Sequence, residues 1–118
     1  MTSPIISVSE RASRIKLLGT VLALVELENG TRVHARVNQI SSNGGLLQLG
    51  EPLKEASAVR LMFHFDEITV RSRAEMLPPI WATKGCLQPF RFLGMNEEMR
   101  TDLAAHVSAL LERSGNRQ

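Results

Sequence analysis

The sequence predicts a mainly β protein: a six- or seven-stranded antiparallel β-barrel followed by one C-terminal α-helix. Apolar residues recur at every second position through the middle of the chain, and turn-forming residues separate these alternating stretches. After Met95 the apolar spacing changes to three and four residues. A strand buries alternate side chains and a helix buries every third or fourth, so the change of period marks a change of element.

The first two predicted strands flank a tight turn. An apolar stretch over residues 19–27 is followed by Glu28-Asn29-Gly30, which is typical of a hairpin turn. The next stretch alternates between an apolar and a polar face: Val33, Ala35 and Val37 against Arg32, His34 and Arg36. We therefore expect one face of the sheet to be buried and the other to face water.

Three further strands are predicted in the same way. Ser42-Asn43-Gly44-Gly45 precedes a short apolar stretch over residues 46–49, and Asp66-Glu67 joins two long strands. The inward-facing residues of the long strands are Val59, Leu61, Phe63 and Phe65 in the first, and Ile68 and Val70 in the second. These spacings favour a meander that closes into a barrel. Pro78-Pro79 cannot donate ladder hydrogen bonds, so we expect it to interrupt pairing or to lie on an edge.

The last element is predicted to be an amphipathic helix. Asn96 is a good N-cap, and Glu97 and Glu98 suit the positive end of the helix dipole. The apolar stripe consists of Met99, Leu103, Val107, Leu110 and Leu111. We expect the helix to run to about Arg113 and to pack on or beside the barrel.

Length and composition limit the possible functions. The 118 residues suit one domain, and the net charge of +2 with a pI near 9.2 favours a small anionic ligand without requiring nucleic acid. The single cysteine, Cys86, allows no internal disulfide. The N-terminus lacks the pattern of a secretory signal, and no apolar run approaches the ~18 residues of a membrane span. We expect a cytoplasmic protein without membrane insertion.

No catalytic site, metal site or cofactor is expected. His34, His64 and His106 lie in separate elements without a cysteine or carboxylate at ligand spacing. Cys86 has no histidine partner in a motif, and the nucleophile-elbow and phosphate-loop patterns are absent. The protein is therefore not expected to be an enzyme.

Two kinds of macromolecular partner can be weighed from the outward positions. A basic outer face, made by Arg32, His34, Arg36, Arg71 and Arg73, would suit single-stranded nucleic acid, but these strands present no outward aromatic residues to stack on bases. Nucleic acid is therefore not the expected partner.

Most methionines, among them Met76 and Met95, are expected to fill the core. Met62 and Trp81 leave open an apolar patch for an unidentified protein partner.

Two short motifs resemble the signature of the PilZ family, in which R-x-x-x-R is followed about twenty to thirty residues later by [D/N]-x-S-x-x-G. The second motif is Gln39-Ile40-Ser41-Ser42-Asn43-Gly44, where Ser41 and Gly44 match and Gln39 departs from the pattern. Arg14 lies twenty-five residues before Gln39, in the place of the second arginine. Glu10 stands where the first arginine belongs, and Arg11 gives R-x-x-R, one residue short.

The resemblance extends beyond these motifs. Pro89-Phe90-Arg91-Phe92-Leu93-Gly94 looks like the last barrel strand of PilZ domains, which leads into a C-terminal helix. The resemblance as a whole covers roughly Arg11 to Leu111. The resemblance implies a stand-alone PilZ domain with a degenerate cyclic di-GMP motif. Its parts would be a flexible N-terminal segment carrying the arginines (1–16), a barrel with a C-terminal helix (17–113) and a polar tail (114–118).

The resemblance also implies a function. The ligand would be cyclic di-GMP, contacted by Arg11, Arg14, Gln39, Ser41 and Gly44, and the protein would be a receptor or adaptor that regulates a partner protein in motility, adhesion or exopolysaccharide processes. Arginine suits this ligand because its planar fork pairs with phosphate oxygens or a guanine edge. The alternative is a PilZ-like protein-interaction module that has lost cyclic di-GMP binding.

Overall fold

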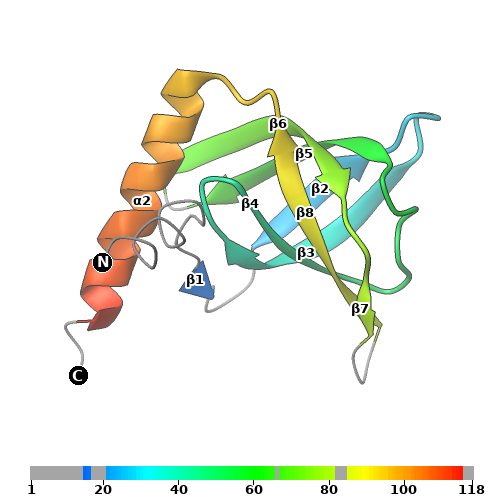
Figure 1. Ribbon diagram of the computed structural model, residues 1–118, viewed down its shortest axis with the longest axis horizontal. Helices are drawn as coiled ribbons and strands as arrows, with labels where there is room; N and C mark the ends of the chain where they lie inside the picture. Colours follow the sequence, from blue (N-terminus) through cyan, green and yellow to red (C-terminus); the bar gives the residue numbers. More distant parts are fainter. Residues whose placement is uncertain (1–14, 17–20, 66, 82–84, 116–118) are drawn as a thin grey trace, which may run out of the picture.

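The computed structural model describes residues 15–16, 21–65, 67–81 and 85–115 (Figure 1). These residues form one antiparallel sheet and one helix. The elements are β1 (Ile15–Lys16), β2 (Leu22–Glu26), β3 (Arg32–Ile40), β4 (Gly44–Leu49), β5 (Ala58–Phe65), β6 (Ile68–Met76), β7 (Ile80–Trp81), β8 (Cys86–Leu93) and α2 (Glu97–Gly115).

Six of the strands close into a barrel. Their order is β3-β2-β5-β6-β8-β4, and β4 pairs back with β3, so every barrel strand has two neighbours. The two-residue strands lie outside this ring: β1 pairs with β3, and β7 pairs with β8. The predicted antiparallel barrel with a C-terminal helix is confirmed.

The strand order differs from the predicted meander. In a meander β4 would pair with β5, whereas β5 pairs with β2, and β4 lies between β3 and β8. The link over residues 50–57 carries the chain past β8 to the β5–β6 hairpin. The link is tied to the end of β6, because Ala56 N donates to Met76 O (2.8 Å) and Met76 N donates to Ser57 O (3.0 Å). Alternation tells which face a residue occupies but not which strand lies beside it, so the meander prediction was wrong.

The predicted inward faces form the core. Buried and exposed side chains alternate along β5, where Val59, Leu61, Phe63 and Phe65 are buried and Arg60 and His64 are exposed. Phe90 and Phe92 of β8 pack edge to face, with ring centroids 5.3 Å apart. Burying these side chains supplies most of the driving force for closing the barrel, at about 1.5–3 kcal/mol for a fully buried large apolar side chain.

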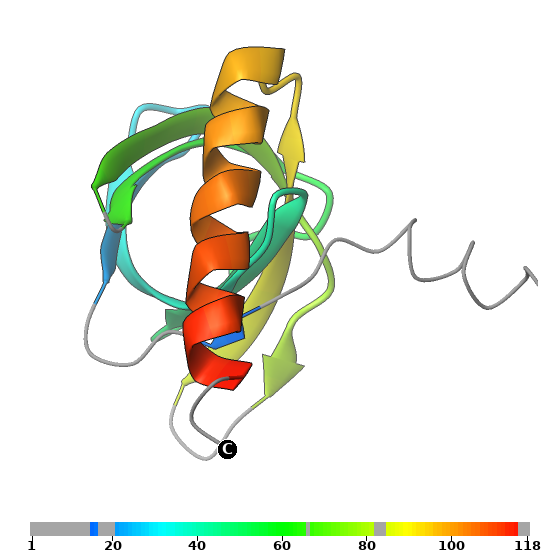
Figure 2. The same cartoon turned by 90° about the vertical axis from the view of Figure 1, so that its left-hand side faces the viewer.

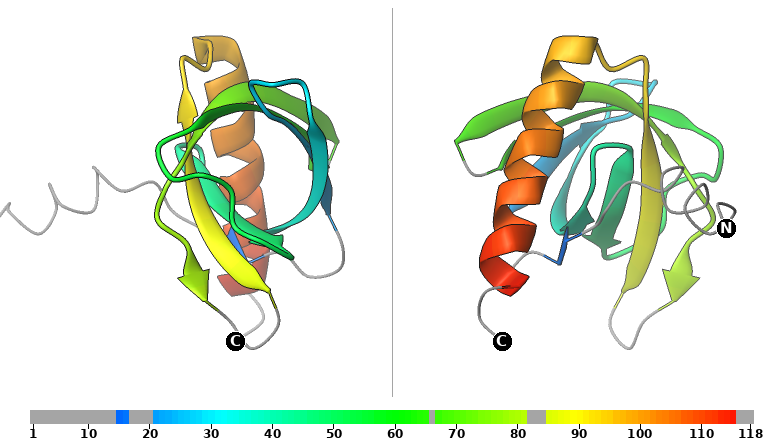
Figure 3. Two further views of the ribbon diagram at one scale, coloured as in Figure 1. Left: turned by 90° about the vertical axis from the view of Figure 1, so that its right-hand side faces the viewer. Right: turned by 60° about the vertical axis from the view of Figure 1, so that its left-hand side comes forward.

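The helix lies across one end of the barrel, as Figure 2 shows. The left panel of Figure 3 views the barrel from its other end, with the helix behind it. Asn96 caps it as predicted, since its Oδ1 accepts from Met99 N (2.7 Å). Leu103 and Val107 are buried against the core. The helix ends at Gly115, two residues beyond the predicted end. Within the described residues, no helix is long and apolar enough to cross a membrane.

One polar side chain is fully buried in β8. Gln88 has no exposed surface, and its Oε1 accepts from Leu53 N (2.7 Å). Its Nε2 donates to Leu53 O (2.8 Å) and Leu77 O (3.0 Å). The amide therefore fastens both the β4–β5 link and the residue after β6 to β8.

Replacing Gln88 by Leu should destabilise the protein. The substitution keeps the side-chain volume but leaves three backbone groups without their partner, which should cost about 2–4 kcal/mol of unfolding free energy. Urea denaturation would measure this. The matched control is Gln48→Leu in β4, because Gln48 makes no side-chain hydrogen bond within the described residues and should change stability by less than about 0.5 kcal/mol. Equal effects of the two substitutions would show that the Gln88 hydrogen bonds do not hold the β4–β5 link to β8.

Candidate functional site

The motif identified in the sequence forms the β3–β4 turn. Gln39 lies next to the end of β3, just after a bulge that shifts the register between Val37 and Gln39, and Gly44 begins β4. The short β1 runs beside this strand end, with Ile15 opposite Ile40 and Lys16 opposite Gln39. The chain that directly follows Arg14 in the sequence therefore lies beside the motif. Arg11 and Arg14 themselves lie outside the described residues.

Ser41 holds the turn together. Its backbone N donates to Gly44 O (2.8 Å), and its Oγ accepts from the backbone N atoms of Asn43 and Gly44 (3.2 Å each). The hydroxyl also lies 3.2 Å from Gly44 O, to which it donates. Only 2% of Ser41 is exposed. In this conformation the Ser41 hydroxyl is committed to the turn, not directed to solvent.

The two glycines that begin β4 are required by the close approach of neighbouring backbone. A Cβ on Gly44 would overlap the carbonyl oxygen of Phe90 and lie 2.8 Å from the Cα of Arg91. A Cβ on Gly45 would overlap Gln39 O and lie 3.0 Å from the Phe90 ring. Phe92 N donates to Asn43 O (2.8 Å), which fixes the turn against β8. The glycines thus let β4 and the turn lie directly on β8.

Arg100 is a residue at this site that sequence reasoning missed. It projects from α2, and its Nη1 lies 3.3 Å from both Ser42 O and Asn43 Oδ1, to which it donates. The guanidinium carries five N–H donors, so Nε and Nη2 can bind a further acceptor. In the helical pattern Arg100 is one more polar position, and no local signal links it to a turn 57 residues earlier.

Gln39 and Arg91 complete the surroundings of the turn. The side chain of Gln39 is half-buried. Arg91 of β8 is the register partner of Gly44, and its Nη2 lies 2.6 Å from Glu75 Oε1. The arginine side chain is 62% exposed, so this ion pair contributes little to stability. It does offset part of the positive charge next to the turn.

The histidines and the cysteine lie apart from the turn. No group of three or more His, Cys, Asp or Glu side chains in the described part of the chain could hold a metal ion. His64 Nδ1 lies 2.8 Å from Thr69 Oγ1, which orients that ring. Cys86 is fully buried in β8, and burial raises the pKa of its thiol.

Met62 and Trp81 do not share one apolar patch, which corrects that expectation. Trp81 is 68% exposed in β7 and pairs with Cys86, the first residue of β8. Met62 lines a groove with Met95 and Met99, near the point where β8 ends and α2 begins. The eight residues of β8 separate these places by roughly 20 Å. Of the methionines expected in the core, Met76 and Met95 are buried.

Solved structures share this architecture. No family model and no curated protein matches the sequence. YcgR from Escherichia coli in complex with cyclic di-GMP is similar with a TM-score of 0.80 at 16% identity, over 91% of this chain and 48% of YcgR. MrkH of K. pneumonia in its apo state gives 0.79 at 13% identity, over 90% of this chain and 51% of MrkH. This chain thus spans about half the length of those proteins.

Isolated domains match over almost their whole length. The PilZ domain of YcgR with cyclic di-GMP has a TM-score of 0.70 at 15% identity, over 91% of this chain and 95% of that domain. The PilZ domain of CeSA from a cellulose-synthesizing bacterium gives 0.62 at 17% identity, over 84% and 98%. The chain therefore has the fold of a PilZ-type domain, as the sequence motifs predicted.

Gly44→Ala should destabilise the protein because the added Cβ meets backbone rather than a movable side chain. We expect a loss of about 2–3 kcal/mol of unfolding free energy, measured by urea denaturation. Gly50→Ala is the matched control, because a Cβ there meets nothing within 4 Å. A Gly44→Ala protein as stable as Gly50→Ala would show that β4 and β8 can separate at little cost.

Cys86 should react slowly with thiol reagents in the folded protein. Burial blocks access, and the raised pKa of the thiol lowers the fraction of reactive thiolate near neutral pH. Labelling by Ellman's reagent at pH 8 should be at least about 100-fold slower in buffer than in 8 M urea. Similar rates in the two solvents would mean that the β7–β8 edge opens readily.

Proposed function

We propose that this protein is a cyclic di-GMP receptor that acts as an adaptor for a partner protein, with the ligand bound where β1 meets the β3–β4 turn. The observation that carries the proposal is the pairing of β1 with the motif strand, because it leads the chain from Arg14 directly to Gln39 and Ile40. Similar folds are found with cyclic di-GMP in YcgR and MrkH. The proposed processes are motility, adhesion or exopolysaccharide production; the structurally similar MotI is an inhibitor of motility.

Each residue of the proposed site has a distinct role. Arg11 and Arg14 bind the phosphates or guanine edges of the dinucleotide through bidentate hydrogen bonds. Gln39 offers its side-chain amide to a guanine edge. Ser41 and Gly44 give the turn its shape, and the free donors of Arg100 add positive charge beside it. No covalent step is involved, and the ligand acts by changing the surface shown to the partner.

The proposed organisation follows from these roles. Residues 1–16 bear the arginines, residues 17–113 form the body on which the ligand rests, and residues 114–118 are a polar tail. Binding holds Arg11 and Arg14 against the β3–β4 turn, next to α2. The switch is therefore local to one end of the barrel, where β1 and α2 are in contact.

A second function is favoured by one specific observation. The Ser41 hydroxyl, Ser42 O and Asn43 Oδ1 are already hydrogen-bonded within the protein. A turn that satisfies its own polar groups can serve purely as structure, and the protein would then be a PilZ-like interaction module without cyclic di-GMP binding. In that case Arg14→Ala would leave partner binding and cellular function unchanged.

Isothermal titration with cyclic di-GMP separates the two functions. The receptor proposal expects saturable binding that weakens about 10- to 100-fold in Arg14→Ala, because one charge-assisted contact is worth about 1.5–3 kcal/mol. Glu10→Arg completes the R-x-x-x-R spacing with Arg14 and should strengthen binding. Arg36→Ala is the control, since Arg36 lies exposed on β3 away from the turn. An absence of heat and of thermal shift at about 100 µM ligand would rule out the receptor function.

A further inference from the structure

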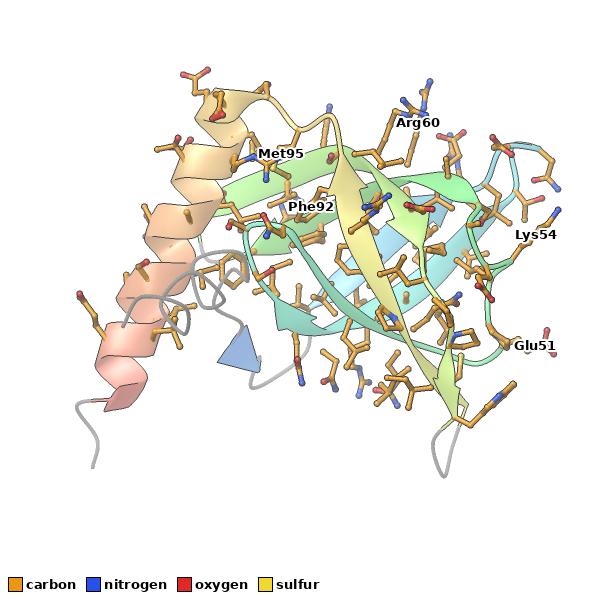
Figure 4. All side chains as sticks on the ribbon, viewed as in Figure 1. Glu51, Lys54, Arg60, Phe92 and Met95 are labelled. Atoms are coloured by element: carbon orange, nitrogen blue, oxygen red, sulfur yellow. The ribbon has the colours of Figure 1, made fainter. Side chains whose placement is uncertain are left out.

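Three arginines gather on the outer face of the β5–β6 hairpin, which we call the arginine cluster: Arg60, Arg71 and Arg73. All three are exposed. Arg60 pairs directly with Arg73 across the two strands, and Arg71 pairs with Met62. Figure 4 shows Arg60 projecting from the barrel into solvent. The register thus places three cationic side chains around one methionine.

The fold gains little from the arginine cluster. Within the described part of the chain, none of its guanidinium groups has an ion pair or a hydrogen bond, whereas Arg91 on the neighbouring β8 pairs with Glu75. Like charges directly opposite each other in an antiparallel pair are destabilising. Glu26 of β2 is the other register partner of Arg60 and offsets part of this repulsion, which a bound anionic group would reduce further.

A groove with a mixed apolar and polar lining adjoins the arginine cluster. It has a volume of about 530 Å³ and lies between the β5–β6 hairpin and the start of α2. Met62, Met95 and Met99 supply its apolar lining, and Figure 4 shows Met95 at the junction of the strands and the helix. Its polar lining consists of His64, Thr69, Arg71, Ser72 and Asn96. Methionine is flexible and polarizable, so such a groove can adapt to different apolar side chains.

The groove and the arginine cluster form one continuous surface. Arg71 belongs to both, and its cross-strand partner Met62 lines the groove. A ligand that fills the groove with an apolar side chain would hold neighbouring groups beside Arg60, Arg71 and Arg73. Carboxylates are the side-chain groups of a protein partner that complement guanidinium forks.

We propose that this surface docks an acidic segment of a partner protein, which inserts an apolar side chain among Met62, Met95 and Met99 and directs carboxylates to Arg60, Arg71 and Arg73. Nucleic acid fits less well, because no Phe, Trp or Tyr lines the groove or belongs to the arginine cluster, and the His64 ring in the groove is held by Thr69. An anionic membrane fits less well too, because the methionines line a groove instead of protruding from the surface.

This surface is separate from the proposed nucleotide site. The arginine cluster lies on β5 and β6, whereas the motif turn joins β3 and β4, and these two hairpins do not pair. The docking proposal therefore does not depend on cyclic di-GMP binding. It requires only the described barrel and helix.

The test is a selection of random dodecapeptides displayed on phage against the whole protein, followed by fluorescence anisotropy of the enriched peptides. We expect enrichment of sequences with two or more Asp or Glu residues around a large apolar residue. Arg60→Ala and Arg71→Ala should each weaken their binding at least tenfold, and so should Met62→Glu. Arg36→Ala on β3 is the matched control and should leave binding unchanged.

Folding of the variants is checked by thermal melting. Because Arg60→Ala removes both the repulsion with Arg73 and the attraction to Glu26, its melting temperature should stay close to that of the parent protein. Enrichment of peptides without acidic residues, no enrichment, or equal binding by the arginine variants would overturn the proposal. Tighter binding of a 20-nucleotide single strand, or of vesicles containing phosphatidylglycerol, that is lost in Arg60→Ala would also overturn it and assign the surface to that partner.

Discussion

The contact on which much of this structure depends is the close approach of β4 to β8 at Gly44. The pairing of β4 with both β3 and β8 closes the ring of six strands. That approach is possible only because residue 44 carries no Cβ, which would overlap the backbone of Phe90, and the missing Cβ of residue 45 likewise lets β4 approach Gln39 of β3. The same contact positions the Ser41 turn, to which α2 is attached through Arg100. Barrel closure, motif shape and helix position are therefore coupled at one point.

This coupling changes how the motif is interpreted. Serine and glycine at the matching positions would ordinarily suggest polar contact and close approach to a ligand. Here the fold alone accounts for both residues. The Ser41 hydroxyl accepts a hydrogen bond from the backbone of the turn, and Gly44 leaves room for the backbone of β8. What distinguishes a receptor from a ligand-free relative must then lie in the residues that the fold does not require. Among the described residues of the motif, the half-buried Gln39 makes no side-chain hydrogen bond to another described residue.

Alternation along the strands allowed the inward faces of the barrel to be predicted from the sequence, because each strand buries one side. The strand order could not be predicted in this way, since β5 and β4 have equally apolar inward faces and only the β4–β5 link decides their neighbours. The first half of β8 was missed because Gln88, a polar residue, occupies an inward position and interrupts the pattern. Arg100 was missed because its contact with Asn43 joins distant parts of the chain.

The two proposed surfaces differ in what holds them in place. The β3–β4 turn is fixed by backbone contacts and by a helix arginine, so a ligand there would meet a preformed edge. The β5–β6 surface is formed by regular strand pairing, and its side chains are exposed or flexible. The helix is common to both, because Arg100 reaches the turn and Met99 lines the groove on the same first turns of α2. A shift of these turns on ligand binding would alter the groove, which gives nucleotide and partner a direct physical route to influence each other.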